Sequence, residues 1–151
     1  MSYHIRPMTI DDVDDVYAIE LSAHKAPWSR DILRDCVLVG YDCRVLESCE
    51  RAEPEIISYI ILRYYDHTCH ILNLCVALAS QGKGYGRLLL QNVIDSLVGS
   101  EVEALILEVR PSNLTAISLY KKMGFYQAGI KKDYYQDELG VEDAVLLKKD
   151  I

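Results

Sequence analysis

The chain has no apolar run that approaches the length of a membrane-spanning helix, and its first seven residues lack the apolar core of a signal peptide. It also lacks an excess of basic residues, because 16 Lys and Arg stand against 23 Asp and Glu, for a net charge of −7. Proteins that bind duplexes need a basic surface, so direct nucleic-acid binding is not expected. We therefore expect a cytoplasmic protein without membrane or nucleic-acid contact, whose acidic balance suits a basic peptide or amine.

The five cysteines are odd in number and include no C-x-x-C pair, so we expect reduced thiols rather than disulfides. One short segment contains several potential metal ligands, namely His67, Cys69 and His70. His67 and Cys69 are expected to share one strand face, but no fourth ligand is evident, and no metal is predicted. Cys75 is not predicted to be a nucleophile, because no cation lies near it in its apolar strand.

A chain of 151 residues, half of them hydrophobic, predicts one domain at residues 1–151 with a sizeable core. The strand–helix–strand crossover from 70 to 109 requires a parallel pair, and the hairpins on either side are antiparallel. The predicted fold class is therefore α/β, with a mixed sheet and helices on both faces. Residues 134–137 are predicted to begin the loop between the last two strands, 125–132 and 141–148. Spacing and caps predict strand 5–8, helices 9–24 and 30–38, strands 41–47, 55–65 and 70–76, helix 84–98, strand 104–109, helix 111–123, and strands 125–132 and 141–148.

A glycine-rich stretch follows the strand at 70–76 and leads into a helix; it reads Gln81-Gly82-Lys83-Gly84-Tyr85-Gly86-Arg87. Strand, glycine turn and helix N-terminus together make an anion site, because glycine allows close backbone approach and the first helical N–H groups point outward. Lys83 and Arg87 add full positive charges. The spacing fits neither the nucleotide phosphate loop nor the dinucleotide fingerprint. We interpret the stretch as a pyrophosphate site; the alternative is a glycine turn before an ordinary helix.

Glu108 is the only acid in the apolar run at 104–109, at the strand end where open α/β sheets bind ligands. We predict a general base whose pKa is raised towards neutrality by partial burial; a structural ion pair with Arg110 is the alternative. Tyr120 lies on an apolar helix stripe, so it is either a core residue or a phenol that protonates a departing thiolate. Asn113 either caps that helix or reaches a cofactor with its amide.

The chain contains two spaced motifs, Gln81-x-x-Gly84-x-Gly86 and Asn113-x-x-Ala116-x-x-Leu119-Tyr120-x-x-x-Gly124-Phe125. Both resemble motifs of the GCN5-related N-acetyltransferases (GNAT), which bind acetyl-CoA. Three further stretches resemble the RimI-type enzymes of that family, which acetylate the N-terminal alanine of the eighteenth small-subunit ribosomal protein of bacteria. These are Ala23-His24-x-x-Pro27-Trp28-Ser29, Leu107-Glu108-Val109-Arg110-x-Ser112-Asn113, and Tyr134-Tyr135 with Glu142-Asp143-Ala144. The resemblance spans nearly the whole chain and implies a mostly antiparallel sheet of about seven strands with a splayed central parallel pair.

The resemblance also implies a role for each matching residue. Glu108 would be the general base and Tyr120 the general acid, in a direct transfer within a ternary complex. Trp28, Tyr134 and Tyr135 would border the groove for the N-terminal peptide of the ribosomal protein. The residues implied to bind acetyl-CoA are Leu74, Cys75 and Val76 along the pantetheine arm, Gln81, Gly82, Lys83, Gly84, Tyr85, Gly86 and Arg87 at the pyrophosphate, and Asn113.

Two positions depart from the family pattern. Ala77-Leu78 stand where Asp-Pro is usual after the splayed strand, and Gly82 stands where a positive residue often follows the first Gln. These departures bear on loop rigidity and phosphate affinity rather than on the fold. Two other functions stay open: an acetyltransferase for a small amine or another protein N-terminus, and a non-catalytic regulator that binds acetyl-CoA.

Overall fold

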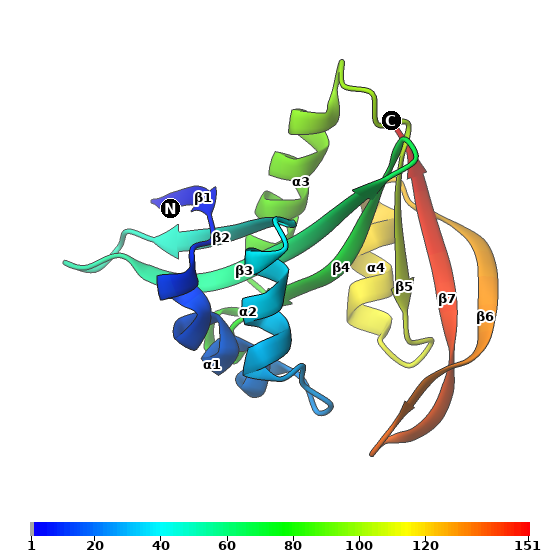
Figure 1. Ribbon diagram of the computed structural model, residues 1–151, viewed down its shortest axis with the longest axis horizontal. Coiled ribbons are helices and arrows are strands. Elements are labelled where there is room, and N and C mark those ends of the chain that lie inside the picture. The colour runs from blue at the N-terminus through cyan, green and yellow to red at the C-terminus, as the bar shows by residue number, and fades with distance from the viewer. Residues whose placement is uncertain (1) are drawn as a thin grey trace.

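The computed structural model describes residues 2–151, whose strands form one seven-stranded sheet in the order β1-β2-β3-β4-β5-β7-β6 (Figure 1). The predicted order of elements and the α/β class are confirmed. No helix among these residues is long and apolar enough to cross a membrane. The strands are β1 (Tyr3–Pro7), β2 (Asp42–Ser48), β3 (Glu55–Tyr65), β4 (Thr68–Val76), β5 (Ala104–Val109), β6 (Tyr126–Asp137) and β7 (Gly140–Asp150). The helices are α1 (Val13–Ala23), α2 (Arg30–Leu38), α3 (Tyr85–Leu97) and α4 (Leu114–Lys122), with 3-10 turns at Ile10–Asp12 and Leu78–Ser80.

The parallel pair β4 and β5 is joined only at its N-terminal end, where residues 68–70 pair with 104–106. Beyond His70 the two strands diverge, as Figure 1 shows. Each keeps its other neighbour, because β4 pairs with β3 as far as Val76 and β5 pairs with β7 as far as Val109. The splayed pair that the resemblance implies is therefore confirmed, and residues 71–76 have no neighbouring strand on their β5 side.

Helices cover both faces of the sheet, and each contributes an apolar stripe to one of two cores. Leu89 and Val93 of α3 are fully buried on one face, and Tyr120 of α4 belongs to the same core. Val16 of α1 and Leu33 of α2 are fully buried on the other. Full burial of such side chains contributes about 1.5–3 kcal/mol each, and their helical spacing is what the sequence pattern predicts. These stripes hold α3 and α1 on opposite faces of the sheet.

The C-terminal hairpin is longer than the sequence predicts. β6 continues through Asp137 and β7 begins at Gly140, so residues 134–137 belong to a strand and the loop prediction is wrong. β6 is an edge strand that is exposed along most of its length. Its C-terminal half therefore has no alternation of apolar side chains that would predict a strand. Its register shifts between Lys131 and Tyr135, and Asp133 there has a φ of 52°.

Two further expectations need correction at the N-terminal half. β1 begins at Tyr3, two residues before the predicted start. His67 lies in the turn before β4, with a φ of 60°, and its Nδ1 atom is 3.1 Å from the carbonyl oxygen of Glu101. It therefore does not share a strand face with the buried Cys69. All five cysteines are free, as expected.

Candidate active site

The glycine-rich loop leads from β4 into α3, with Gly82 at a φ of 78° and Gly84 at 88°. Both lie in the left-handed region that side chains disfavour, which explains the glycines. α3 begins at Tyr85, and no side chain among residues 2–151 bonds to its N-terminal turn as a cap. The first N–H groups and the positive end of the helix dipole therefore stay available to an anion. Gln81 ties the loop to β4, because its Nε2 donates to the carbonyl of Val76 at 3.0 Å.

A cavity of about 410 Å³ lies between this loop, β4 and α4. Ala23 and His24, at the end of α1, form part of its wall. The structure therefore brings together the predicted general acid and the predicted cofactor residues other than Lys83. Lys83, Glu108, Trp28, Tyr134 and Tyr135 do not line it. The predicted site residues that line it are Leu74, Cys75, Val76, Gln81, Gly82, Gly84, Tyr85, Gly86, Arg87, Asn113 and Tyr120.

A larger hollow of about 960 Å³ lies between α1 and the turn that joins β2 to β3. Its charged lining includes Arg6 and Asp12, which already form an ion pair at 2.7 Å. Neither the glycines of the loop nor the predicted catalytic side chains reach it. The smaller cavity is therefore the candidate site, because the glycine loop and Tyr120 line it although its volume is smaller.

Glu108 is almost buried, with its side chain 6% exposed, between donors from two other strands. Its Oε2 lies 2.6 Å from Nε2 of His70 on β4, and its Oε1 accepts from Nζ of Lys131 on β6 at 2.5 Å. Arg110, the partner considered in the sequence analysis, bonds instead to Asp137 and Glu142. The carboxylate is therefore ion-paired, but with residues far from it in the sequence.

These partners overturn the expected pKa of Glu108. Burial raises the pKa, as the sequence analysis expected, but the hydrogen bonds and charges of His70 and Lys131 together outweigh burial. The pKa falls from 4.5 to about 2. The expectation of a pKa near neutrality is wrong for the protein without substrate, because both donors stabilise the charged carboxylate.

The position of Tyr120 is compatible with both interpretations that its place on the helix left open. Its ring packs edge-on against Phe125 with centroids 5.3 Å apart, and it belongs to the core. It also lines the cavity. Burial raises the pKa of its phenol, which therefore stays protonated at neutral pH, as a general acid must.

Asn113 caps α4, because its Oδ1 accepts from the backbone N–H of Ala116 at 3.2 Å. The capping alternative is thus confirmed. The residue also lines the cavity, and a cap that uses the oxygen leaves the amide N–H₂ for a ligand. One side chain can serve both purposes.

The aromatic residues predicted to border a peptide groove lie outside the cavity. Tyr135 packs under Arg110, whose guanidinium carbon is 4.2 Å from the ring centroid, and its ring centroid is 5.0 Å from that of Tyr134. The half-exposed Tyr134 lies 5.4 Å from Nζ of Lys131, and this contact connects the pair to the partner of Glu108. Trp28 is partly buried and packs against the core to which α1 and α2 contribute.

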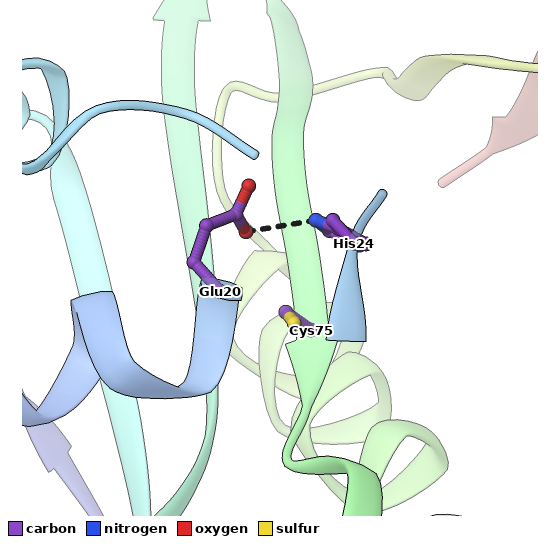
Figure 2. Close-up of side chains that lie close together, drawn as sticks. All are labelled: Glu20, His24 and Cys75. Atoms are coloured by element: carbon purple, nitrogen blue, oxygen red, sulfur yellow. Dashed lines mark hydrogen bonds and ion pairs between the residues drawn. The ribbon is translucent and has the colours of Figure 1, made fainter. Parts of the chain in front are cut away.

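Four residues that no sequence pattern indicated lie beside Glu108 or beside Cys75 at the cavity wall. His70 and Lys131 hold Glu108, and Glu20 and His24 lie beside Cys75 (Figure 2). A parallel pair of strands places His70 near Glu108, so the topology contained a signal that sequence spacing did not. No cation lies near Cys75 in the sequence, as expected, but the fold brings His24 beside it. Contact with Cys75, and then with Glu20, raises the pKa of His24 to about 10.

Comparisons with known proteins agree with this geometry. A [ribosomal protein bS18]-alanine N-acetyltransferase of Salmonella typhimurium is 32% identical over 93% of this chain and 92% of its own. The crystal structure of the ribosomal-protein-S18-alanine N-acetyltransferase from Escherichia coli superposes with a TM-score of 0.89 at 31% identity, covering 99% of this chain and 94% of that one. Arabidopsis thaliana NAA60 in complex with acetyl-CoA shares the fold, with a TM-score of 0.86 at 20% identity and 99% coverage of both chains. Residues 13–125 match the model of the acetyltransferase (GNAT) family. The chain therefore belongs to the acetyltransferase (GNAT) family.

Proposed function

We propose that the protein transfers the acetyl group of acetyl-CoA to the α-amino group of the N-terminal alanine of ribosomal protein bS18, in the cytoplasm. The observation that carries this proposal is the cavity that joins the glycine loop of α3, the unpaired side of β4 and the phenol of Tyr120. Relatives named for this reaction match 93% and 99% of the chain, which supports the choice of substrate.

The residues around the cavity suit acetyl-CoA, which supplies an activated acetyl thioester. The free N–H groups at the start of α3, with Lys83 and Arg87, suit its pyrophosphate. Residues 71–76 offer unpaired backbone to an extended arm that carries amides, as an open strand offers it to a peptide. Asn113 can add an amide donor.

Glu108 is the proposed base, and it acts through a water because it does not line the cavity. An α-amino group with a pKa near 8 arrives mostly charged at neutral pH. Its ammonium has the same charge as Lys131, which is 46% exposed and can be displaced from Glu108. Loss of that partner raises the pKa of Glu108, so arrival of the substrate makes the carboxylate a stronger base.

The remaining steps use groups that line the cavity. Cys75 and Val76 line the cavity, and backbone N–H groups near them are proposed to bind the negative charge that develops on the carbonyl oxygen. Tyr120 donates its proton to the departing thiolate. Trp28, Tyr134 and Tyr135 are proposed to border the peptide. The transfer is direct, within a ternary complex, and its chemistry uses no metal.

Mass spectrometry of two peptides tests this proposal. One copies the N-terminus of bS18 with a free alanine, and the other has a blocked α-amine and an internal Lys. A gain of one acetyl group on the first peptide alone is expected. Acetylation of the Lys, or of free small amines in preference to both peptides, would contradict the assigned substrate. Binding of acetyl-CoA without transfer to any amine would leave a regulator that binds the cofactor.

A further inference from the structure

A buried polar cluster lies at the end of α1, against the wall of the cavity, and consists of Glu20, His24 and Cys75 (Figure 2). Glu20 comes from α1, His24 follows that helix directly, and Cys75 comes from β4. The three potential ligand atoms, one from each side chain, all lie within 4.8 Å of one another. Two of the residues, Glu20 and Cys75, are buried, and His24 is partly exposed.

Glu20 is held in place by donors from several elements. Its Oε1 lies 2.8 Å from Nδ1 of His24 and accepts from the Tyr59 hydroxyl and from Nδ2 of Asn73, the latter at 3.1 Å. Its Oε2 accepts from the backbone N–H of Trp28 at 2.8 Å. Such a set of outer partners is what orients a ligating carboxylate in metal sites, and its buried charge attracts a cation.

The three side chains have the chemistry of a particular class of ion. A carboxylate and a thiolate together neutralise one divalent charge, and an imidazole completes three protein ligands. Thiolate and imidazole favour zinc-like ions over Mg²⁺ and Ca²⁺, which prefer oxygen ligands alone. Three protein ligands leave a fourth tetrahedral position, which can open towards the cavity that His24 and Cys75 line.

We propose that Glu20, His24 and Cys75 bind a zinc-type divalent cation and that this ion competes with acetyl-CoA for the cavity. The ion displaces two protons to solvent, one from the Cys75 thiol and one from the His24 imidazolium, and it replaces the hydrogen bond between His24 and Glu20 with coordination. The site is inhibitory, because the metal would lie beside the backbone N–H groups that the proposed transfer uses. It differs from the group at His67 and Cys69, and it departs from the expectation that the protein binds no metal.

Co²⁺ tests the site directly, because a cobalt–thiolate bond gives a charge-transfer absorption band and a tetrahedral site gives strong visible bands. Wild-type protein, reduced and metal-free, is expected to bind one Co²⁺ with both signatures and to exchange it for Zn²⁺ but not for Mg²⁺. Cys75→Ser should remove the thiolate band and weaken Zn²⁺ binding by at least about 100-fold, measured against a chromophoric chelator.

Two variants keep the result interpretable. Cys49→Ser changes an exposed cysteine outside the cluster and should leave Co²⁺ binding unchanged. His24→Gln alters a partly exposed ligand and should weaken Zn²⁺ binding even if Cys75→Ser fails to fold. No stoichiometric Co²⁺ binding by folded wild-type protein, or a thiolate band that survives Cys75→Ser, would overturn the metal site.

The competition rests on the proposed function and needs its own measurement. Calorimetry first gives the affinity of metal-free protein for acetyl-CoA, and the titration is repeated with Zn²⁺ bound. We expect the apparent affinity to fall at least about 10-fold with Zn²⁺ in wild type and to be unaffected by Zn²⁺ in His24→Gln. Equal affinity with and without Zn²⁺ overturns the competition. Failure of the metal-free protein to bind acetyl-CoA counts against the proposed function instead, because the cobalt spectra report on the metal site alone.

Discussion

Nε2 of His70 lies 2.6 Å from Oε2 of Glu108, beside the point at which β4 and β5 separate. The contact fixes the proposed base against the end of the paired segment, and Lys131 bonds the other oxygen. A carboxylate held in this way is charged and oriented before substrate arrives.

Glu108→Gln should lower the acetylation rate by about 10²–10⁴, because the amide cannot accept the proton of the amine. The rate is measured by mass spectrometry at saturating peptide and acetyl-CoA. Glu103→Gln, an exposed acid just before the same strand, serves as the control and should retain the wild-type rate. A Glu108→Gln rate within a few-fold of wild type would remove Glu108 from the chemistry.

Tyr120→Phe should lower the rate by a similar factor, about 10²–10⁴, since it removes the proposed proton donor. The apolar ring stays, so the core packing with Phe125 and the melting temperature should change little. Tyr126→Phe removes a phenol from an exposed tyrosine on β6 and should leave the rate unchanged. Equal rates for all three proteins would show that Tyr120 is a core residue only.

Lys131→Met should raise the pKa of Glu108 above its value of about 2, because it removes one donor to the charged carboxylate. NMR of the ¹³C-labelled glutamate carboxyl groups measures it, with the Glu108 signal assigned by its absence in Glu108→Gln. Lys132→Met, at the next and exposed position, should leave that pKa in place. An unchanged pKa in Lys131→Met would mean that His70 alone sets it.

Acid should reduce the stability that Glu108 contributes. Folding lowers its pKa from 4.5 to about 2, so the contribution is fully present above pH 4.5 and is lost as the pH falls towards 2. At neutral pH it amounts to about 3 kcal/mol at most. Urea unfolding of wild type and Glu108→Gln should therefore differ most at pH 7, and the difference should shrink between pH 4.5 and 3. A gap that is constant over this range would contradict the depressed pKa.

Gly84→Ala should destabilise the folded protein by about 1 kcal/mol, because Gly84 has a φ of 88° and a Cβ is strained there. Gly86→Ala is the matched comparison. Its added Cβ would lie 3.5 Å from Cγ2 of Val76 and 3.7 Å from Cδ2 of Leu119, which are ordinary contacts. Urea unfolding should therefore show a much smaller loss for Gly86→Ala. Equal losses in the two variants would show that backbone conformation is not the reason for Gly84.

Local chemistry in the sequence predicted the parts of the site that are contiguous in the chain. The glycine loop, the cap at Asn113 and the buried stripe with Tyr120 each depend on residues within one turn or one helix. The partners of Glu108 could not be found in this way, because His70 and Lys131 lie 38 and 23 residues away and meet it only across strands. A carboxylate in an apolar run indicates that it has a charged or hydrogen-bonding partner. Only the register of the sheet shows which residue that partner is.

The same limit explains the C-terminal hairpin and the Glu20 cluster. An exposed edge strand carries no apolar period, so Tyr134 and Tyr135 resembled a loop. Glu20 lies on α1 and is fully buried. The donors that compensate its charge, Tyr59 on β3 and Asn73 on β4, are far from it in the sequence.

The early separation of β4 from β5 opens an edge of β4 in the interior of the sheet, besides the outer edges at β1 and β6. An outer edge can be blunted by charge or by a bulge, whereas an interior edge persists only if a ligand or solvent satisfies it. In amide hydrogen exchange, the inner-edge amides of residues 71–76 should therefore exchange as though β4 were a terminal strand. In the proposed function the arm of acetyl-CoA takes this strand position, so a molecule that is not protein completes the sheet.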